Sequence, residues 1–253
     1  MSIPNFFAQN RRKIQQYAKN IGFIKPIHSP HFDIIENKNK EGTGKLREIS
    51  INNIPHDSLH ERTWEVNFDI EESPNNRYIF NTPQGKKKVE KALIVLINKR
   101  LYIYMFEMKS EISHEERKEN SLAQIRQKWV DTMERLSLLL TLYCPEHVYQ
   151  TKIEEGEEVH FCPFDKVKIT YTGILIYNTH SIPTLTTEEN KTDIYCVFKG
   201  EKPRLHIQNE LFGNEPLDLI FLKNETSDME NIRLDFMKDI FKKEIKDESL
   251  FCW

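Results

Sequence analysis

A glutamate and a lysine at the end of an apolar run are the residues in this sequence best placed to do chemistry. The run that starts at Leu101 ends with Glu107 and Lys109. Residues two apart in a strand share a face, and this face also carries Ile103 and Met105. The two charges therefore lie near a core-facing surface, where unpaired charge is costly. Glu-x-Lys recurs elsewhere in this chain in solvated contexts, so the pattern is informative only together with its surroundings.

This pair lies at the end of the second strand of a predicted tight hairpin. Two apolar runs, residues 92–97 and 101–108, are separated by only three polar residues. Such a short separation predicts two antiparallel strands joined by a turn.

The register of that hairpin decides whether a third charged residue joins the pair. With a two-residue turn at Lys99 and Arg100, Glu90 lies opposite Lys109. Glu90, Glu107 and Lys109 then leave one face at one end of the hairpin. A turn one residue longer would place Glu90 on the opposite face.

Two carboxylates beside an ammonium group are typical of metal-assisted phosphoryl chemistry. The carboxylates hold Mg²⁺ (or Mn²⁺), while the lysine orients or activates the attacking water and stabilises charge. The sequence therefore predicts a hydrolytic metal site at the end of the hairpin.

This arrangement resembles a known nuclease superfamily. An acidic residue before one strand, Glu-x-Lys at the end of the next and then a long helix are similar to the PD-(D/E)xK, or restriction-endonuclease-like, superfamily. The resemblance covers roughly residues 60–180. It implies a mixed sheet flanked by helices, and Mg²⁺-dependent cleavage of phosphodiester bonds that leaves 5′-phosphate and 3′-hydroxyl ends.

The resemblance assigns roles to individual residues. Glu107 matches the second acid of the motif, Lys109 matches its lysine, and Met108 would offer its backbone carbonyl to the metal. Glu90 is the candidate for the first acid, although the family usually has Asp there, and Asp69 is the fallback. Loss of the first acid would mean a degenerate, inactive member.

Many members of the superfamily also place a Gln or Lys on the helix after the motif. Gln124, Gln127 and Lys128 occupy that region here. Gln124 is the predicted site residue because it lies in the first turns of the helix.

Nucleic acid, with DNA favoured, is the partner that the resemblance implies, together with a homodimer that cuts both strands. Lys86, Lys87 and Lys88 form either a phosphate-contacting loop beside the site or a solvated turn. The 36 basic and 39 acidic residues give a net charge of -3. Overall charge therefore makes no case for nucleic acid, and such a function must come from local patches.

The sequence predicts a single α/β (α+β) domain over residues 1–253, with a core at about 60–200 and a mixed central sheet. A content of 38% hydrophobic and 30% charged residues is typical of a globular chain. Hydrophobic periodicity predicts the elements around the hairpin: helix 5–20, a long loop 36–58 with a short strand at 46–51, strand 63–70, helix 121–143, strands 167–177 and 193–198, and helix 228–246.

Two other classes of function remain open from the residues. The first is a non-catalytic module that binds nucleic acid or protein through a degenerate nuclease fold, with Glu107 and Lys109 as a simple ion pair. The second is a zinc-stabilised module, because four thiol and imidazole side chains flank an acidic turn. These are Cys144, His147, His160 and Cys162.

Location and pathway are expectations of a coarser kind. The longest purely apolar run, residues 92–97, is far shorter than the roughly 20 residues that cross a bilayer, and the first residues lack the features of a signal peptide. We therefore expect a cytoplasmic protein with reduced cysteines. Restriction, phage defence, repair and mobile-element processing all use the nuclease scaffold, and the fold does not choose among them.

Overall fold

The computed structural model describes eleven segments of the chain: residues 24–35, 46–56, 61–66, 68, 88–97, 100–142, 150–154, 157–161, 169–182, 205–209 and 213–241. Several predictions lie outside these residues: helix 5–20, strand 193–198, Asp69, Lys86, Lys87, and the zinc candidates Cys144, His147 and Cys162.

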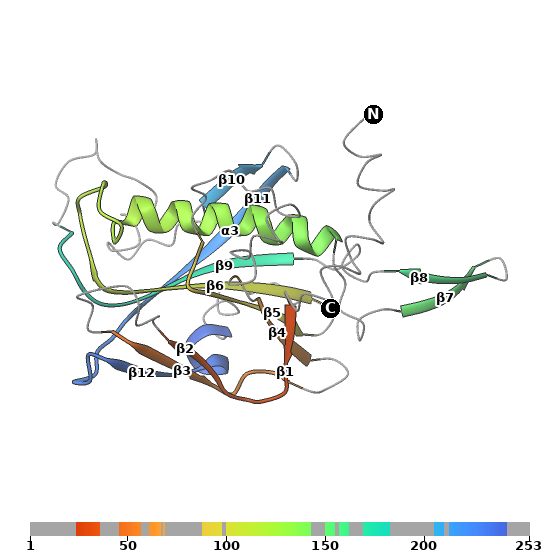
Figure 1. The fold of residues 1–253 in the computed structure, drawn as a ribbon, viewed down its shortest axis with the longest axis horizontal. Helices are drawn as coiled ribbons and strands as arrows, with labels where there is room; N and C mark the ends of the chain where they lie inside the picture. The colour runs from red at the N-terminus through yellow and green to blue at the C-terminus, as the bar shows by residue number, and fades with distance from the viewer. Residues whose placement is uncertain are drawn as a thin grey trace, which may run out of the picture.

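A seven-stranded mixed sheet forms the centre of the fold (Figure 1). Its strand order is β1-β4-β5-β6-β9-β11-β10, with β6, β9 and β11 running parallel and the other neighbours antiparallel. The strands are β1 (Ile24–Ile27), β4 (Glu61–Val66), β5 (Lys91–Ile97), β6 (Arg100–Ile112), β9 (Ile169–His180), β10 (Leu205–Asn209) and β11 (Gly213–Lys223). The prediction of a mixed central sheet is therefore confirmed.

The β5–β6 hairpin is confirmed, but its predicted register is wrong by two residues. Ile97 pairs with Arg100, and Ala92 pairs with Met105. In the predicted register Ala92 would instead face Glu107. A shift of two residues leaves every side chain on its original face, so the predicted grouping of charges survives the error.

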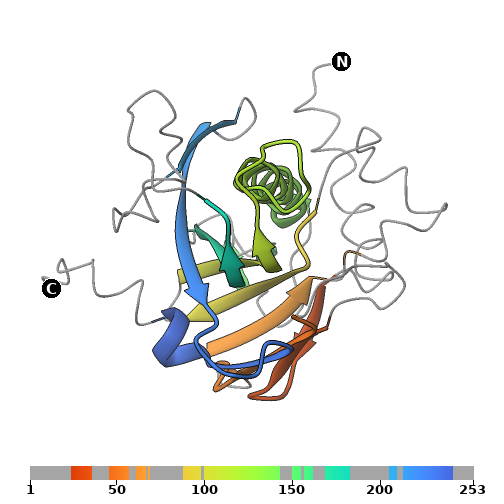
Figure 2. The ribbon, with the colours of Figure 1, turned by 90° about the vertical axis from the view of Figure 1, so that its left-hand side faces the viewer.

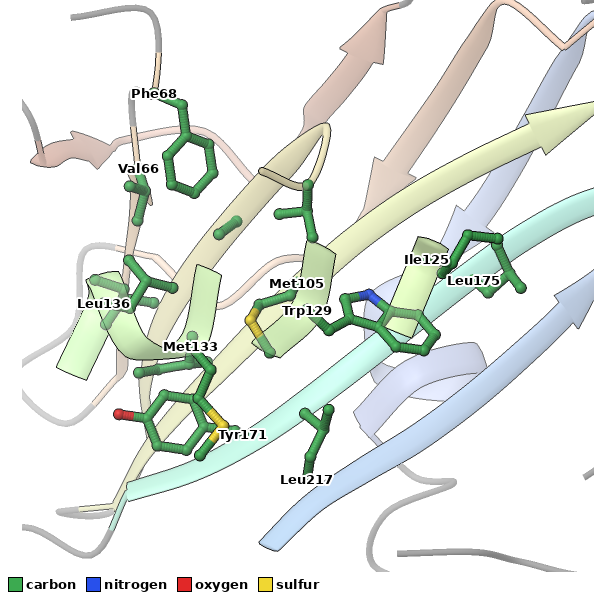
Figure 3. Close-up of a cluster of buried hydrophobic side chains, with 14 of the residues drawn as sticks. Val66, Phe68, Met105, Ile125, Trp129, Met133, Leu136, Tyr171, Leu175 and Leu217 are labelled. Carbon is green, nitrogen blue, oxygen red and sulfur yellow. The ribbon is translucent and has the colours of Figure 1, made fainter. Parts of the chain in front are cut away.

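Helix α3 (Leu122–Leu142) covers one face of the sheet, and it confirms the predicted helix 121–143. Figure 3 shows its apolar side chains packed over β6 and β9. Buried residues recur along it at steps of three and four: Leu122, Ile125, Trp129, Met133 and Leu136.

A glycine allows this close packing of α3. A Cβ atom on Gly173 of β9 would lie 2.8 Å from Cδ2 of Trp129, closer than real Cβ contacts allow. The indole therefore lies directly on the backbone of β9, which brings the helix close to the centre of the sheet.

A small three-stranded sheet covers the opposite face (Figure 2). Its order is β12-β3-β2, formed by Asn231–Asp235, Glu48–Asn52 and Phe32–Ile35. Its apolar residues, with those of the π-helix η5 (Phe236–Phe241), form a second core against β5 and β6. Among the described residues, helix α3 thus flanks one face, and a sheet with a single short helix flanks the other.

The predicted helix 228–246 is wrong in its first half. Residues 231–235 form β12, which runs parallel to β3, and within the described residues 228–241 only 236–241 are helical. Ile232 is buried between the exposed residues Asn231 and Arg233, the alternation of a strand. The four-residue spacing between Ile232 and Phe236 therefore links a strand residue to a residue of the following helix and does not reflect one continuous helix.

Other boundaries also differ from the predictions. Strand 63–70 is β4, which ends at Val66, and strand 46–51 is β3, shifted by up to two residues. Strand 167–177 is β9, which continues to His180. Strands β1, β2, β7 (Gln150–Glu154), β8 (Glu157–Phe161), β10 and β11 were also missed. Strands β7 and β8 form a hairpin at the predicted acidic turn.

Candidate metal and phosphate site

Glu107 and Lys109 lie on the face of β6 that α3 covers. Ile103 and Met105, on the same side of the strand, belong to the core beneath α3, whereas Phe106 belongs to the opposite core. The Glu107 side chain is fully buried, at 0% exposure. The prediction that this pair points towards the core is confirmed.

Backbone hydrogen bonds hold Glu90 at the entrance to β5. Its amide donates to the carbonyl of Phe106 at 3.1 Å, and Phe106 is also the β6 residue paired with Lys91. The preceding amide, of Val89, donates to the Thr132 hydroxyl of α3 at 3.2 Å. The helix and the neighbouring strand therefore fix the backbone from which Glu90 extends.

The structure brings all three predicted residues together. Lys109 Nζ lies 2.6 Å from Glu107 Oε1 and 3.6 Å from Glu90 Oε1. The Glu90 side chain is 35% exposed, whereas that of Lys109 is only 17% exposed. Glu90 therefore forms the solvent-facing side of the cluster and Glu107 its buried base.

A second lysine, one of the three helix residues considered but not the one selected, completes the cluster. Lys128 of α3 places Nζ 2.5 Å from Glu107 Oε1 and 4.0 Å from Glu90 Oε1. Two ammonium groups thus contact one carboxylate oxygen, and the charges of the four side chains cancel.

The helix residue predicted for the site was Gln124, but the structure places Lys128 there. The Gln124 amide donates to the carbonyl of Glu116 at 3.3 Å, in the loop that precedes the helix. Gln127 donates to Asp131 at 2.7 Å, along the helix surface. Lys128 is one helical turn beyond Gln124, so sequence reasoning selected the correct face of the helix and the wrong turn.

The second carboxylate oxygen of Glu107 gives the strongest indication of a metal site. Glu107 Oε2 is buried and has no hydrogen-bond partner among the described residues. A buried carboxylate oxygen without a donor is unfavourable, and such atoms call for a physical explanation. A divalent cation at this position would provide one.

The backbone beside Glu107 offers a further oxygen. The pairing of β5 with β6 ends at Lys91 and Phe106. Because alternate residues of a strand direct their backbone groups to the same neighbour, the Met108 carbonyl is directed to the β5 side, beyond this last pair. The prediction that Met108 contributes its carbonyl is compatible with this geometry.

These oxygen donors are better suited to Mg²⁺ than to a cation that needs a protein ligand at every coordination position. No group of three or more His, Cys, Asp or Glu side chains suited to a metal occurs in the described part of the chain. Mg²⁺ typically binds through one or two carboxylates and keeps several waters. Glu90, Glu107 and the Met108 carbonyl would supply such a partial shell.

Lys109 is a charged donor in this environment. Burial by itself would lower the pKa of Lys109, but the carboxylates of Glu107 and Glu90 outweigh that effect and raise it above the ordinary value of 10.5. The Lys109 ammonium group is therefore suited to donating hydrogen bonds and stabilising negative charge rather than to accepting a proton.

Of the three lysines predicted to contact phosphate, only Lys88 is described. Its Nζ lies 3.4 Å from the carbonyl of Phe68, and the residue is partly exposed. Lys88 precedes Glu90 by two residues, so it lies in the segment that leads into β5 beside the charged cluster.

Comparison with known proteins found no matching family model, curated protein or solved structure. No helix among the described residues is both long enough and apolar enough to cross a membrane.

Proposed function

We propose that this protein is a metal-dependent nuclease that hydrolyses phosphodiester bonds, with DNA as the expected substrate and an endonucleolytic mode of cutting. The observation that carries the proposal is the buried carboxylate of Glu107, which has one oxygen bound by two ammonium groups and the other without a partner in the described part of the chain. Glu90 and Lys109 converge on the same position.

The topology around the site supports a restriction-endonuclease-like fold. Strands β4, β5 and β6 are antiparallel neighbours, α3 follows β6, and β9 then pairs parallel to β6. The acids and the lysine lie at the start of β5, where β6 continues past the last residue paired with β5. This position is on the face of the sheet that α3 covers. The small sheet on the opposite face departs from the expectation of helices on both faces.

Each residue has a distinct role in the proposed reaction. Glu90 and Glu107, with the Met108 carbonyl, would hold the cation. Mg²⁺ bound there would polarise the phosphoryl group and lower the pKa of a bound water. Lys109 would donate hydrogen bonds to the attacking water and to a non-bridging phosphate oxygen, where its positive charge stabilises the charge that develops in the transition state.

A second candidate is a non-catalytic module with the same fold that binds nucleic acid or protein. The observation that favours it is the charge balance of the cluster: the charges of two carboxylates and two ammonium groups cancel without a metal. In that case the four residues would form a buried ion-pair network with a purely structural role.

A cleavage assay distinguishes the two candidates. The full-length protein is incubated with linear DNA, circular DNA and single-stranded RNA in the presence of Mg²⁺, Mn²⁺ or EDTA. The variants are Lys109→Ala, Glu107→Ala and the matched control Lys118→Ala, whose lysine pairs with Glu115 on the exposed surface. We expect metal-dependent cutting by the wild type and the control, and its loss in the other two.

Two results would contradict the nuclease proposal. Equal cutting by the wild type and both site variants would place the activity at another site or in a contaminant. No cutting of any substrate would favour the binding module, with Glu90 in place of the usual Asp as the first residue to examine.

A further inference from the structure

Lys128 contacts the carboxylate that a metal site would need. Its ammonium group lies on Glu107 Oε1, the oxygen that Lys109 already contacts, while Oε2 has no partner among the described residues. The contact crosses from α3 to β6, and the Lys128 side chain is only 17% exposed. Lys128 therefore neutralises a buried carboxylate that Lys109 alone already pairs.

The charge of the cluster makes this contact and metal binding antagonistic. With both lysines in place the four side chains are neutral, so a divalent cation would add two positive charges beside a fully buried residue. Like charges this close repel strongly where solvent is excluded. Removal of one ammonium group from the carboxylates would relieve that repulsion.

Of the two lysines, Lys128 is the one whose ammonium group can move away from the carboxylates more easily. Both ammonium groups contact Glu107 Oε1, at 2.5 Å for Lys128 and 2.6 Å for Lys109, but Lys128 Nζ lies farther from Glu90, at 4.0 Å compared with 3.6 Å. A lysine ammonium is a compact charge on a flexible four-carbon stem, so the head group can move while the stem stays packed.

We propose that Lys128 is a tethered counter-ion that competes with a divalent cation for Glu107 and Glu90. It holds the carboxylates together in the metal-free protein, and its positive charge opposes the binding of a cation to the same carboxylates. The inference rests on the proposed metal site and adds a regulating residue to it.

The test measures Mn²⁺ binding by the full-length protein without nucleic acid. Calorimetric titration compares the wild type with Lys128→Met, which keeps the apolar stem and removes the charge. Lys128→Gln provides a second uncharged head group should Lys128→Met fail to fold. The matched control is Lys91→Met, because Lys91 Nζ also pairs with a glutamate, Glu65 Oε1 at 2.6 Å, and its side chain is 28% exposed.

We expect both Lys128 variants to bind Mn²⁺ at least tenfold more tightly than the wild type, a change of about 1.4 kcal/mol. Lys91→Met should bind like the wild type. Adding Glu107→Gln to Lys128→Met should abolish the gain, which would locate it at this site. In thermal unfolding, Mn²⁺ should raise the Tm of Lys128→Met more than that of the wild type.

Failure of this inference is distinguishable from failure of the nuclease proposal. If the wild type binds Mn²⁺ and cleaves nucleic acid while the Lys128 variants bind no more tightly, only the counter-ion role is overturned. If neither the wild type nor the variants bind Mn²⁺, the counter-ion role is overturned, and the cleavage assay decides independently whether the nuclease proposal fails with it.

Discussion

Replacing Glu107 with Gln tests how the charged cluster is held together. The substitution keeps the size of the side chain and removes its negative charge. Of the two carboxylates in the cluster, the two ammonium groups, each 17% exposed, then retain only Glu90 as a charged partner, at 3.6 and 4.0 Å. The cluster changes from neutral to positively charged in a largely buried position.

The expected cost follows from the loss of one partner in a buried ion pair. A unit charge pair about 4 Å apart attracts by roughly 4 kcal/mol at the effective dielectric constant that suits protein sites. Removing one partner of a buried pair typically costs about 3–5 kcal/mol. We therefore expect Glu107→Gln to lower the free energy of unfolding by about 3–5 kcal/mol, and the Tm by roughly 6–20 °C.

The assay is urea unfolding in EDTA, followed by tryptophan fluorescence. Adding Lys128→Met to Glu107→Gln removes the excess positive charge, so the double variant should recover at least about 1 kcal/mol relative to Glu107→Gln alone. The control is Glu65→Gln, which disrupts the more exposed pair with Lys91 and should cost no more than about 1 kcal/mol.

Two outcomes would refute the reasoning. The first is a Glu107→Gln variant that unfolds within about 1 kcal/mol of the wild type, which would mean that the two ammonium groups do not depend on this carboxylate. The second is a double variant in which the two effects simply add, which would mean that Lys128 and Glu107 are not coupled.

Two further predictions concern the surrounding fold. Gly173→Ala should lower the free energy of unfolding by about 1–3 kcal/mol, because its Cβ would lie 2.8 Å from Cδ2 of Trp129 and the indole must shift; an unchanged urea midpoint would contradict the close packing. Hydrogen bonds from the Asn231 side chain and from the amides of Glu230 and Asn231 hold the pKa of Asp228 below its ordinary value of 3.8. The ionised form of Asp228 therefore stabilises the fold above about pH 4 and loses that effect as the pH falls through the lowered pKa. Wild type should be more stable than Asp228→Asn at pH 7, and the difference should disappear in strong acid; a difference that is the same at both pH values would refute the assignment.

The central hairpin and the long helix could be predicted from sequence because their signals are local. Three polar residues between two apolar runs leave little choice but a turn, and the spacing of Ile125, Trp129 and Met133 specifies a helix face. The exact register could not be predicted, because two-residue turns one position apart fit the same pattern. The error did not change the predicted site, because a register shift of two residues keeps every side chain on the same face of the sheet.

The second covering layer could not be predicted because it depends on contacts between distant segments. β12 pairs with β3, which precedes it by about 180 residues. The apolar residues Ile232, Phe236 and Ile240 also fit a helical period, so only the partner strand distinguishes the two structures. Lys128 was missed as a site residue for a similar reason: its role depends on which turn of α3 lies over Glu107, and that follows from helix packing.

The most direct test of the account is the rate at which purified full-length protein cleaves DNA in Mg²⁺ and in EDTA, measured beside Lys109→Met. The variant is first shown to be folded by the same urea unfolding assay. The account predicts cleavage by the wild type only with the metal, leaving 5′-phosphate and 3′-hydroxyl ends, and no cleavage by the folded variant. Cleavage that persists in EDTA, or that the folded variant performs as fast as the wild type, would contradict it.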